Sequence, residues 1–354
     1  TQIDIEMSFA GRDDVLSVTE GLMGHVFKKV LGKDIPKNFR RLTWEEAMEQ
    51  YGSDKPDLRF DMQLKDFSPF VENSGFQAFK DALGAGGAVK ALVVTGAASY
   101  SRKQIEELEA HAKIYKARGL AWMKIAPGGA FEGGVSKFFT ENARITSDLG
   151  AKEGDLILIV ADAKRNVANT ALGAVRSKLG RDLGLCAPDT FEFAWIVDFP
   201  MFEYNEEEQK WEAAHHLFTW PQEKYHSTME SDPGSVKGDL YDLVLNGYEL
   251  ASGSIRIHDP EMQRRVFKIA GIDPAQAEKK FGFLTEAFKY GAPPHGGIAP
   301  GLDRLVMIMA GLSSLKDVIA FPKNSFAVSP MDDCPSEIEQ KQLDELHLVI
   351  KREQ

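Results

Sequence analysis

One segment, residues 238–257 with the sequence GDLYDLVLNGYELASGSIRI, constrains the fold of this chain more than any other. Two apolar runs rich in β-forming residues flank Asn-Gly at positions 246 and 247. Asn-Gly between such runs is a strong signal of a two-residue hairpin with a type I′ turn. The pairs expected in this hairpin are Leu245 with Tyr248, Val244 with Glu249, and Asp242 with Ala251. The chain is therefore expected to contain an antiparallel sheet built around this hairpin.

Two acids of the hairpin should lie on one face of that sheet. Side chains alternate along a strand, so Asp242 and Glu249 are expected to be diagonal neighbours that could hold one cation between them. Arg256 follows Glu249 by seven residues, an odd number that places it on the opposite face. A one-residue bulge among the small residues 252–254 would return Arg256 to the face of the acids. The alternative is an ordinary hairpin whose polar face is solvated.

Composition limits the class of protein. Apolar residues make up 43% of the chain and charged residues 27%, as in ordinary globular proteins. No apolar run approaches the roughly 20 residues of a membrane span, so no membrane association is expected. A net charge of −11 argues against nonspecific nucleic-acid binding, although a structured RNA could dock on a local patch. Cys186 and Cys334 form no metal or disulfide pattern, which favours a cytoplasmic location. Since the chain starts in a strand and without methionine, we expect it to be part of a longer protein.

The first sixty residues predict a strand, two helices and a turn-rich segment. Residues 1–9 alternate strictly, with an apolar face and a polar face that carries Gln2, Asp4 and Glu6. Residues 13–31 predict an amphipathic helix stopped by Gly32. Its expected inward residues are Val15, Val18, Leu22, Val26 and Val30. Thr43 and Glu46 form a capping box for a short helix that should end near Gly52. Residues 51–60 (YGSDKPDLRF) are rich in turn-forming residues.

A different pattern runs from about residue 60 to residue 188. Strand-like runs at 89–95, 119–125 and 155–161 alternate with helical stretches near 101–117, 134–146 and 163–180. This block predicts a separate α/β insert. We find no catalytic constellation in it, and His111, on a charged helix, is interpreted as a surface residue.

The remainder contains two further informative stretches. His215 and His216 would point to opposite faces if they lay on a strand, so one of them could face a site. Residues 293–312 (PPHGGIAPGLDRLVMIMAGL) lead through glycines into an apolar helix with Asp303 and Arg304 in its first turn. A guanidinium there needs an anionic partner, either a carboxylate such as that of Asp303 or a phosphate at the helix start. Residues 260–290 should be mostly helical, and a final helix is expected with Ser336 and Glu339 as its capping box. Residues expected in the core of these two regions are Phe267, Ile269, Phe281, Phe283, Leu284, Phe288, Ile338, Leu343, Leu346 and Ile350.

Taken in order, these segments resemble class II aminoacyl-tRNA synthetases, and specifically the aspartyl enzymes of bacterial type. TQIDIE resembles the second strand of motif 2 of that class, and HGGIAPGLDRL resembles motif 3, with Asp303 where many members carry Glu. YGSDKPDLR, IVDFPMFE, the His-His pair, NGYELASGSIRIH and VIAFPK follow the aspartyl family in order, and the block at 60–188 resembles its inserted GAD domain. One departure is Leu217, where the family usually has proline. The resemblance covers essentially the whole chain.

The resemblance implies an α+β fold: a six-stranded antiparallel sheet flanked by helices, divided into a first catalytic part (1–59), the inserted α/β GAD domain (60–188) and a second catalytic part (189–354). It implies ATP-dependent activation of L-aspartate to aspartyl-adenylate and transfer to the 3′ end of tRNA-Asp. Implied aspartate-binding residues are Gln2, Asp4, His215 and Arg256. Implied ATP-binding residues are Glu249, Gly301, Leu302, Asp303 and Arg304. Implied Mg²⁺ ligands are Asp242 and Glu249.

The resemblance also sets limits on this chain. The anticodon-binding barrel, motif 1 and the first half of motif 2 with its arginine are not in this sequence, so no catalytic residue beyond the binding residues is assigned, and the chain is expected to be inactive by itself. The full-length protein is expected to be a homodimer. Alternatives are an ammonia-dependent asparagine synthetase, which would lack the insert, and a catalytically silent paralogue that binds tRNA, which the intact Asp242, Glu249, Arg256 and Arg304 disfavour. The asparaginyl and lysyl synthetases are disfavoured by the insert.

Overall fold

A computed structural model describes residues 1–351 of the chain in two compact units. One unit comprises residues 3–300, and the other comprises residues 1–2 together with residues 301–354. Each unit is described by itself below. Among the described residues, no helix combines the length and the apolar character that crossing a membrane requires.

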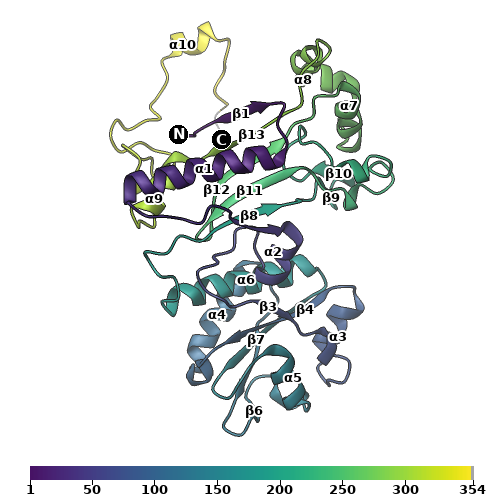
Figure 1. Cartoon of the computed structure of the whole chain (residues 1–354), viewed down its shortest axis with the longest axis vertical. Helices are drawn as coiled ribbons and strands as arrows, with labels where there is room; N and C mark the ends of the chain where they lie inside the picture. Colours follow the sequence, from purple (N-terminus) through teal and green to yellow (C-terminus); the bar gives the residue numbers. More distant parts are fainter. Residues whose placement is uncertain (352–354) are drawn as a thin grey trace. The chain divides into compact units, whose positions relative to one another are not determined.

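A six-stranded sheet forms the centre of the first unit (Figure 1). Its strand order is β1-β13-β12-β11-β8-β2, and every neighbouring pair is antiparallel except β2 with β8. The strands are β1 (Ile5–Ser8), β2 (Arg40–Thr43), β8 (Phe193–Val197), β11 (Leu240–Leu245), β12 (Tyr248–Ile255) and β13 (His295–Pro300). The predicted antiparallel sheet is therefore confirmed. The first strand is shorter than the predicted 1–9 at both ends, and at its C-terminal end the chain turns at Phe9, whose φ is 55° and whose side chain is 82% exposed.

The predicted hairpin is confirmed, but the prediction of its register and bulge is partly wrong. Asn246 and Gly247 both have positive φ, as a type I′ turn requires. Asp242 pairs with Ser252 rather than with Ala251, because Leu250 is an extra residue between the paired residues Glu249 and Ala251. The small residues 252–254 serve another purpose: they pair regularly with β13. A Cβ on Gly253 would lie 2.2 Å from the carbonyl oxygen of Gly297, so this position must be glycine.

Helix α1 (Arg12–Leu31) confirms the first predicted helix and ends at Gly32 in the left-handed conformation, as expected. The predicted inward face is right at Val15, wrong at Val18 and Val30, and half-buried at Leu22 and Val26. The buried residues are Val15, Leu16, Thr19, Met23 and Phe27, whereas Val18 and Val30 are exposed. The true buried stripe includes a threonine, whose hydroxyl donates to the carbonyl of Val15, and valine spacing alone did not reveal it. Helix α2 (Trp44–Tyr51) has the predicted Thr43–Glu46 capping box and ends at Gly52.

A second sheet lies within the predicted insert, with the strand order β3-β4-β7-β5-β6. All its pairs are antiparallel, so the alternation of strands and helices does not produce a parallel sheet. Helix α5 begins later than the predicted 134–146, because the glycine turn at 133–134 and a 3₁₀ turn precede it. The strands are β3 (Leu64–Asp66), β4 (Ala88–Val94), β5 (Ala121–Ile125), β6 (Phe131–Glu132) and β7 (Leu156–Asp162). The helices are α3 (Gln77–Gly84), α4 (Arg102–Ile114), α5 (Asn142–Leu149) and α6 (Arg165–Asp182). The domain boundaries at 60 and 188 remain a prediction.

The rest of the first unit follows the predicted order. A hairpin of β9 (Phe202–Asn205) and β10 (Lys210–Ala213) has the acidic residues 206–208 at its tip. Helices α7 (Pro260–Ile269) and α8 (Pro274–Phe288) account for the helical region. Phe267 and Phe288 are buried as predicted, but Phe283 is 79% exposed because it lies on the outer face of α8. Short 3₁₀ helices lie at Ser68–Phe70, Ala97–Ser99, Ser136–Phe138, Glu223–Tyr225 and Pro233–Ser235.

The second unit contains α9 (Leu302–Met309), a 3₁₀ turn (Leu315–Asp317) and α10 (Gln340–Glu345). The final helix is shorter than predicted and begins after Glu339, so the Ser336–Glu339 capping box is wrong. Only Leu343 of its predicted inward residues is buried, whereas Ile338, Leu346 and Ile350 are exposed. Six residues form too short a helix to bury an apolar stripe two turns long.

The guanidinium of Arg176 joins the insert to the segment that precedes it. Arg176 lies on α6 and is 1% exposed. Its Nε donates to the carbonyl oxygen of Met62 at 2.7 Å, and its Nη2 donates to the carbonyls of Asp57 and Phe60, each at 2.9 Å. The guanidinium also lies over the rings of Phe60 (4.1 Å) and Tyr51 (4.9 Å). Burial lowers the pKa of Arg176 to about 10, so the group remains charged at neutral pH.

Two further contacts hold α2 against α6 and against strand β4. A Cβ on Gly52 would lie 2.1 Å from the carbonyl oxygen of Asn169, so the end of α2 approaches α6 backbone to backbone. Lys90 on β4 is 2% exposed, and its ammonium pairs with Glu49 on α2. A buried ammonium requires such a partner. Helices α2 and α6 therefore lie between the two sheets of the first unit, as Figure 1 shows.

We predict that Arg176→Lys lowers the free energy of unfolding by about 2–4 kcal/mol. A lysine ammonium cannot reach three carbonyl groups with the geometry of a guanidinium, and each buried carbonyl left without a donor costs about 1–3 kcal/mol. Urea denaturation followed by circular dichroism would measure the change. The matched control is Arg165→Lys, an exposed arginine on the same helix whose replacement should change stability by less than about 0.5 kcal/mol. Equal effects of the two substitutions would contradict the prediction.

Candidate active site

One face of the six-stranded sheet, called here the site face, carries Asp242, Glu249 and Arg256. Because Leu250 is the extra residue of the hairpin, Ser252 lies opposite Asp242, and Arg256 follows four residues later on the same face. The bulge therefore brings Arg256 to the side of the two acids, as the sequence predicted, although it lies two residues earlier than expected.

Arg256 is surrounded by polar groups on the site face. Its Nη1 donates to the hydroxyl of Ser254 at 3.0 Å and lies 3.0 Å from Nε2 of His216. Its Nε lies 3.8 Å from a carboxylate oxygen of Glu6 on β1. Glu6 and Ser254 both pair with Gly297 of β13, so β1 and β12 present these side chains to the same place. Because the carboxylate of Glu6 is too distant for a close ion pair, the guanidinium of Arg256 is suited to bind an additional carboxylate.

His216, rather than His215, is the histidine beside Arg256. Burial, followed by the charge of Arg256, lowers the pKa of His216 to about 4, so the ring is neutral at pH 7. The backbone N–H of Phe218 lies 3.2 Å from Nδ1, and Nη1 of Arg256 lies 3.0 Å from Nε2. A guanidinium can only donate, so the shorter, charge-assisted contact makes Nε2 an acceptor from Arg256. The neutral ring therefore holds the guanidinium without compensating its charge.

The two histidines do not lie on a strand, so the expectation that they point to opposite faces of one does not apply. Strand β10 ends at Ala213, before the pair. The ring of His215 packs edge-on against Phe199, with centroids 5.0 Å apart. The role of His215 beside the amino acid remains a proposal. The adjacent Leu217 accepts a hydrogen bond from Gln263 through its carbonyl at 2.8 Å.

Asp242 is a buried carboxylate with an unsatisfied oxygen. Its side chain is 4% exposed, and its Oδ1 has no hydrogen-bond partner among the described residues. Burial is the main cause that raises the pKa of Asp242 to about 7, and the charges of Glu249 and Asp54 raise it further. A hydrogen bond from Ser252 opposes the shift. An orphaned buried oxygen next to a second carboxylate fits a bound cation.

A complete metal cage is not present. Across residues 1–351, no group of three or more His, Cys, Asp or Glu side chains has the arrangement of a metal site. Asp242 and Glu249 could therefore supply only part of the coordination of a hard cation. Magnesium is usually held in this way, by one or two carboxylates with phosphate oxygens and water completing the shell.

The remaining predicted residues lie in two places. Asp4 is exposed and belongs to the first unit, where strand alternation places it on the same face as Glu6. Gln2 belongs to the second unit and forms an isolated antiparallel bridge with Gly301. Gly301 is the N-cap of α9, Leu302 is 37% exposed, and Asp303 accepts from the chain-terminal ammonium of Thr1 at 2.7 Å. Arg304, in the first turn of α9, is half-buried.

Sequence reasoning missed several groups around the site. Asp54, in the turn-rich segment, acts electrostatically on both Asp242 and His215, and Lys55 acts on Asp242. Glu6 and His216 contact Arg256. The polar alternation of residues 1–9 did contain a signal for Glu6. Asp54 and Lys55 lie in YGSDKPDLR, one of the segments that carry the family resemblance, but their proximity to Asp242 depends on how the loop folds.

Comparison with known proteins now identifies the family. The family model described as tRNA synthetases class II (D, K and N) matches residues 1–325, and the chain belongs to this family. The described sheet and flanking helices have the fold of this class.

Individual relatives are similar over the whole chain. An aspartate–tRNA(Asp/Asn) ligase of Treponema denticola is 70% identical over 354 residues, which cover 99% of this chain and 60% of the relative. The ligase of the same name from Treponema pallidum is 55% identical, over 99% of this chain and 58% of the relative. An aspartate–tRNA ligase of Macrococcus caseolyticus is 50% identical, over 100% of this chain and 60% of the relative. The chain thus spans about three fifths of the length of these relatives.

We predict that Asp242→Asn raises the free energy of unfolding by about 1–3 kcal/mol at pH 8, because it removes a buried charge whose Oδ1 has no hydrogen-bond donor among the described residues. The raised pKa fixes the sign of the pH dependence. The cost of the carboxylate is absent below about pH 4, grows as pH rises towards 7, and is constant above that. Urea denaturation at pH 5 and pH 8 should show the larger gain at pH 8.

The matched control is Asp198→Asn, because Asp198 accepts hydrogen bonds from Arg12 and Gln222, each at 2.7 Å. Losing this paired charge should lower stability. If Asp242→Asn also lowers stability at pH 8, the carboxylate is satisfied in solution and the argument for a cation site fails.

Proposed function

We propose that the protein containing this chain is an aspartate–tRNA ligase, which activates L-aspartate with ATP and transfers the aspartyl group to the 3′ end of tRNA. Membership of the class II family and the names of the 70% and 50% identical relatives support this proposal. Because the chain spans only part of these relatives, the activity is proposed for the full-length protein. The geometry around Arg256 is the single observation that carries the choice of aspartate as the amino acid.

Arg256 would bind the side-chain carboxylate of aspartate. Its guanidinium offers a planar pair of donors, and the neutral His216 beside it leaves the positive charge of Arg256 uncompensated. The weak ion pair with Glu6, at 3.8 Å, leaves room for a closer carboxylate. The amide of asparagine would leave the guanidinium charge uncompensated. A site built on such polar matching can reject the wrong analogue by roughly 10⁴-fold.

The ammonium group of aspartate would lie against acids of the first strand. Asp4 and Glu6 share one face of that strand, and Gln2 offers an amide oxygen in the same polar series. His215 would lie against the amino acid. Positioning of the substrate, rather than covalent catalysis by the protein, would account for most of the rate acceleration of adenylate formation.

ATP contacts are proposed within each unit by itself, at Glu249 in the first unit and at the start of α9 in the second. Gly301, Leu302 and Asp303 begin that helix, whose first N–H groups and dipole favour an anion, and Arg304 would pair with the terminal phosphate. Asp242 and Glu249 fit Mg²⁺ because the buried Oδ1 of Asp242 has no donor among the described residues. When bound, the ion would neutralise charge on the phosphates.

The proposal extends to the tRNA and to assembly. Two of the relatives named above are ligases for both tRNA-Asp and tRNA-Asn, and we propose the same relaxed choice of tRNA for the full-length protein. A homodimer in the cytoplasm is also proposed. Aminoacylation of tRNA-Asp and tRNA-Asn transcripts with labelled aspartate tests the tRNA choice. Charging of both transcripts is expected, and charging of tRNA-Asp alone would contradict the relaxed choice of tRNA.

ATP–pyrophosphate exchange by the full-length protein tests the activity itself. Exchange that depends on aspartate, and not on asparagine or lysine, is expected. Exchange with another amino acid would change the assignment within the family. Adenylate formation followed by transfer to ammonia would favour an asparagine synthetase, and no exchange would favour a catalytically silent tRNA-binding relative.

We predict that Arg256→Lys in the full-length protein lowers kcat/KM for aspartate by at least about 100-fold, because a point charge cannot reproduce a two-pronged contact. The KM for ATP should change by less than about threefold, since other residues would hold the phosphates. Pyrophosphate exchange at varied aspartate and ATP concentrations separates the two constants. Arg265→Lys is the control, because Arg265 pairs with Glu230 away from the site face. A rise in the KM for ATP without a loss of aspartate use would overturn the role of Arg256.

A further inference from the structure

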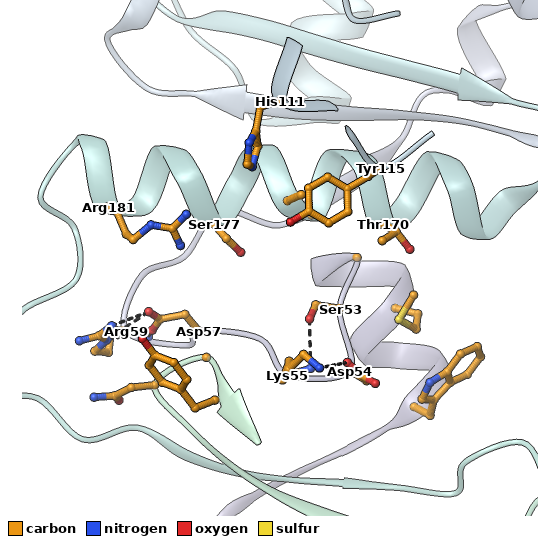
Figure 2. Close-up of a pocket in the computed structure, with 18 residues that line it drawn as sticks. Ser53, Asp54, Lys55, Asp57, Arg59, His111, Tyr115, Thr170, Ser177 and Arg181 are labelled. Carbon is orange, nitrogen blue, oxygen red and sulfur yellow. Dashed lines mark hydrogen bonds and ion pairs between the residues drawn. The ribbon is translucent and has the colours of Figure 1, made fainter. Parts of the chain in front are cut away.

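A cavity of about 560 Å³ lies beside the site face, and none of the functions proposed above uses it. Its walls are the segment 53–59, helices α4 and α6, and the tip of the β11–β12 hairpin (Figure 2). We call it the hairpin-tip cavity. Asp54 and Lys55 belong to its wall and also act electrostatically on Asp242, so the cavity borders the candidate active site. Its volume is within the range of small-molecule sites.

The charges lining the cavity favour an anion. Asp57 is held by Arg59, whose Nη2 lies 2.6 Å from Oδ2 of the acid, and Asp54 pairs with Lys55 at 3.8 Å. The charges of these two acids are thus matched in number by the cations Arg59 and Lys55, although the contact of Asp54 with Lys55 is long. For the fifth charged residue, Arg181, we find no side-chain hydrogen bond or ion pair within residues 1–351. The cavity wall therefore carries one excess positive charge, that of Arg181, which can bind an anionic ligand.

Helix α6 presents Arg181 together with two hydroxyl groups. Thr170, Ser177 and Arg181 have the spacing i, i+7 and i+11, which places them on one face of the helix. In Figure 2 their side chains line the same edge of the cavity. A guanidinium with hydroxyl donors on the same helix face matches the oxygens of a phosphate group.

Aromatic rings complete the cavity. Tyr115, at the end of α4, is 40% exposed, and its ring lies 5.5 Å from that of His111. Tyr248, at the hairpin tip, is 39% exposed on another wall. Half-exposed rings provide faces on which a planar base can stack. His111, interpreted from the sequence as a surface residue, therefore lines a cavity.

We propose that the hairpin-tip cavity binds a nucleotide unit, with its phosphate at Arg181 and its base against Tyr115. The same chemistry is present in a free mononucleotide and in a single-stranded RNA. This inference goes beyond the proposed function, since binding requires only the present chain and a nucleotide. Loss of pyrophosphate exchange would leave it intact, and loss of nucleotide binding would leave the exchange reaction intact.

Binding to the 354-residue chain tests the proposal. One probe is a fluorescein-labelled single-stranded RNA of six nucleotides, followed by anisotropy. The other is cytidine monophosphate, followed by calorimetry. Arg181→Ala should weaken binding by about tenfold or more, as loss of a hydrogen bond to a charged group does. Tyr115→Ala should weaken it by roughly 5- to 100-fold, as loss of base stacking does. Lys178→Ala is the control, because Lys178 lies on α6 outside the cavity and pairs with Asp182; its effect should be below about twofold.

The two probes also separate the sources of the nucleotide. If both bind and both depend on Arg181 and Tyr115, the cavity recognises a single nucleotide unit. If only the RNA binds in this way, the ligand is an RNA strand, and the salt dependence should fall by about 0.7 in log–log slope in Arg181→Ala. If neither probe binds, or if Lys178→Ala weakens binding as much as Arg181→Ala does, the proposal is wrong.

Discussion

The buried guanidinium of Arg176 is the interaction on which much of the first unit depends. It binds three carbonyl oxygens of the segment between α2 and β3, and it fixes that segment against α6. The same segment carries Asp54 and Lys55 to Asp242, and Asp57 and Arg59 to the wall of the hairpin-tip cavity. An arginine suits this position because its planar fork of donors satisfies several carbonyls at once.

The site face has the opposite character, because two of its charged groups lack a close partner of opposite charge among the described residues. The buried Oδ1 of Asp242 has no donor there, and the carboxylate of Glu6 approaches Nε of Arg256 only to 3.8 Å. A buried oxygen without a donor costs folding free energy. A cation at Asp242 and a carboxylate at Arg256 would supply the missing charges. These are the ligands that the proposed function assigns to the two residues.

Sequence patterns predicted the fold well where local rules decide it. The Asn-Gly turn, the Thr43–Glu46 capping box, the Gly32 stop and the strands of the insert all depend on neighbours in the chain. The buried face of α1 and the C-terminal helix were predicted wrongly. Burial there depends on what packs against the helix, and valine or leucine spacing alone does not report that. The family resemblance, in turn, depended on the order of motifs and not on packing.

The sequence by itself determined the hairpin, the two acids and the arginine of the site, and the family to which the chain belongs. Only the tertiary structure decided that Leu250 is the bulged residue, that His216 rather than His215 lies beside Arg256, and that Glu6, Asp54 and Lys55 join them. The physical reason is the range of the forces involved. Turn and cap preferences act over a few residues and can be predicted from the residue types in that short stretch. The environment of a charge is set by groups distant in sequence, which meet only when the core has packed.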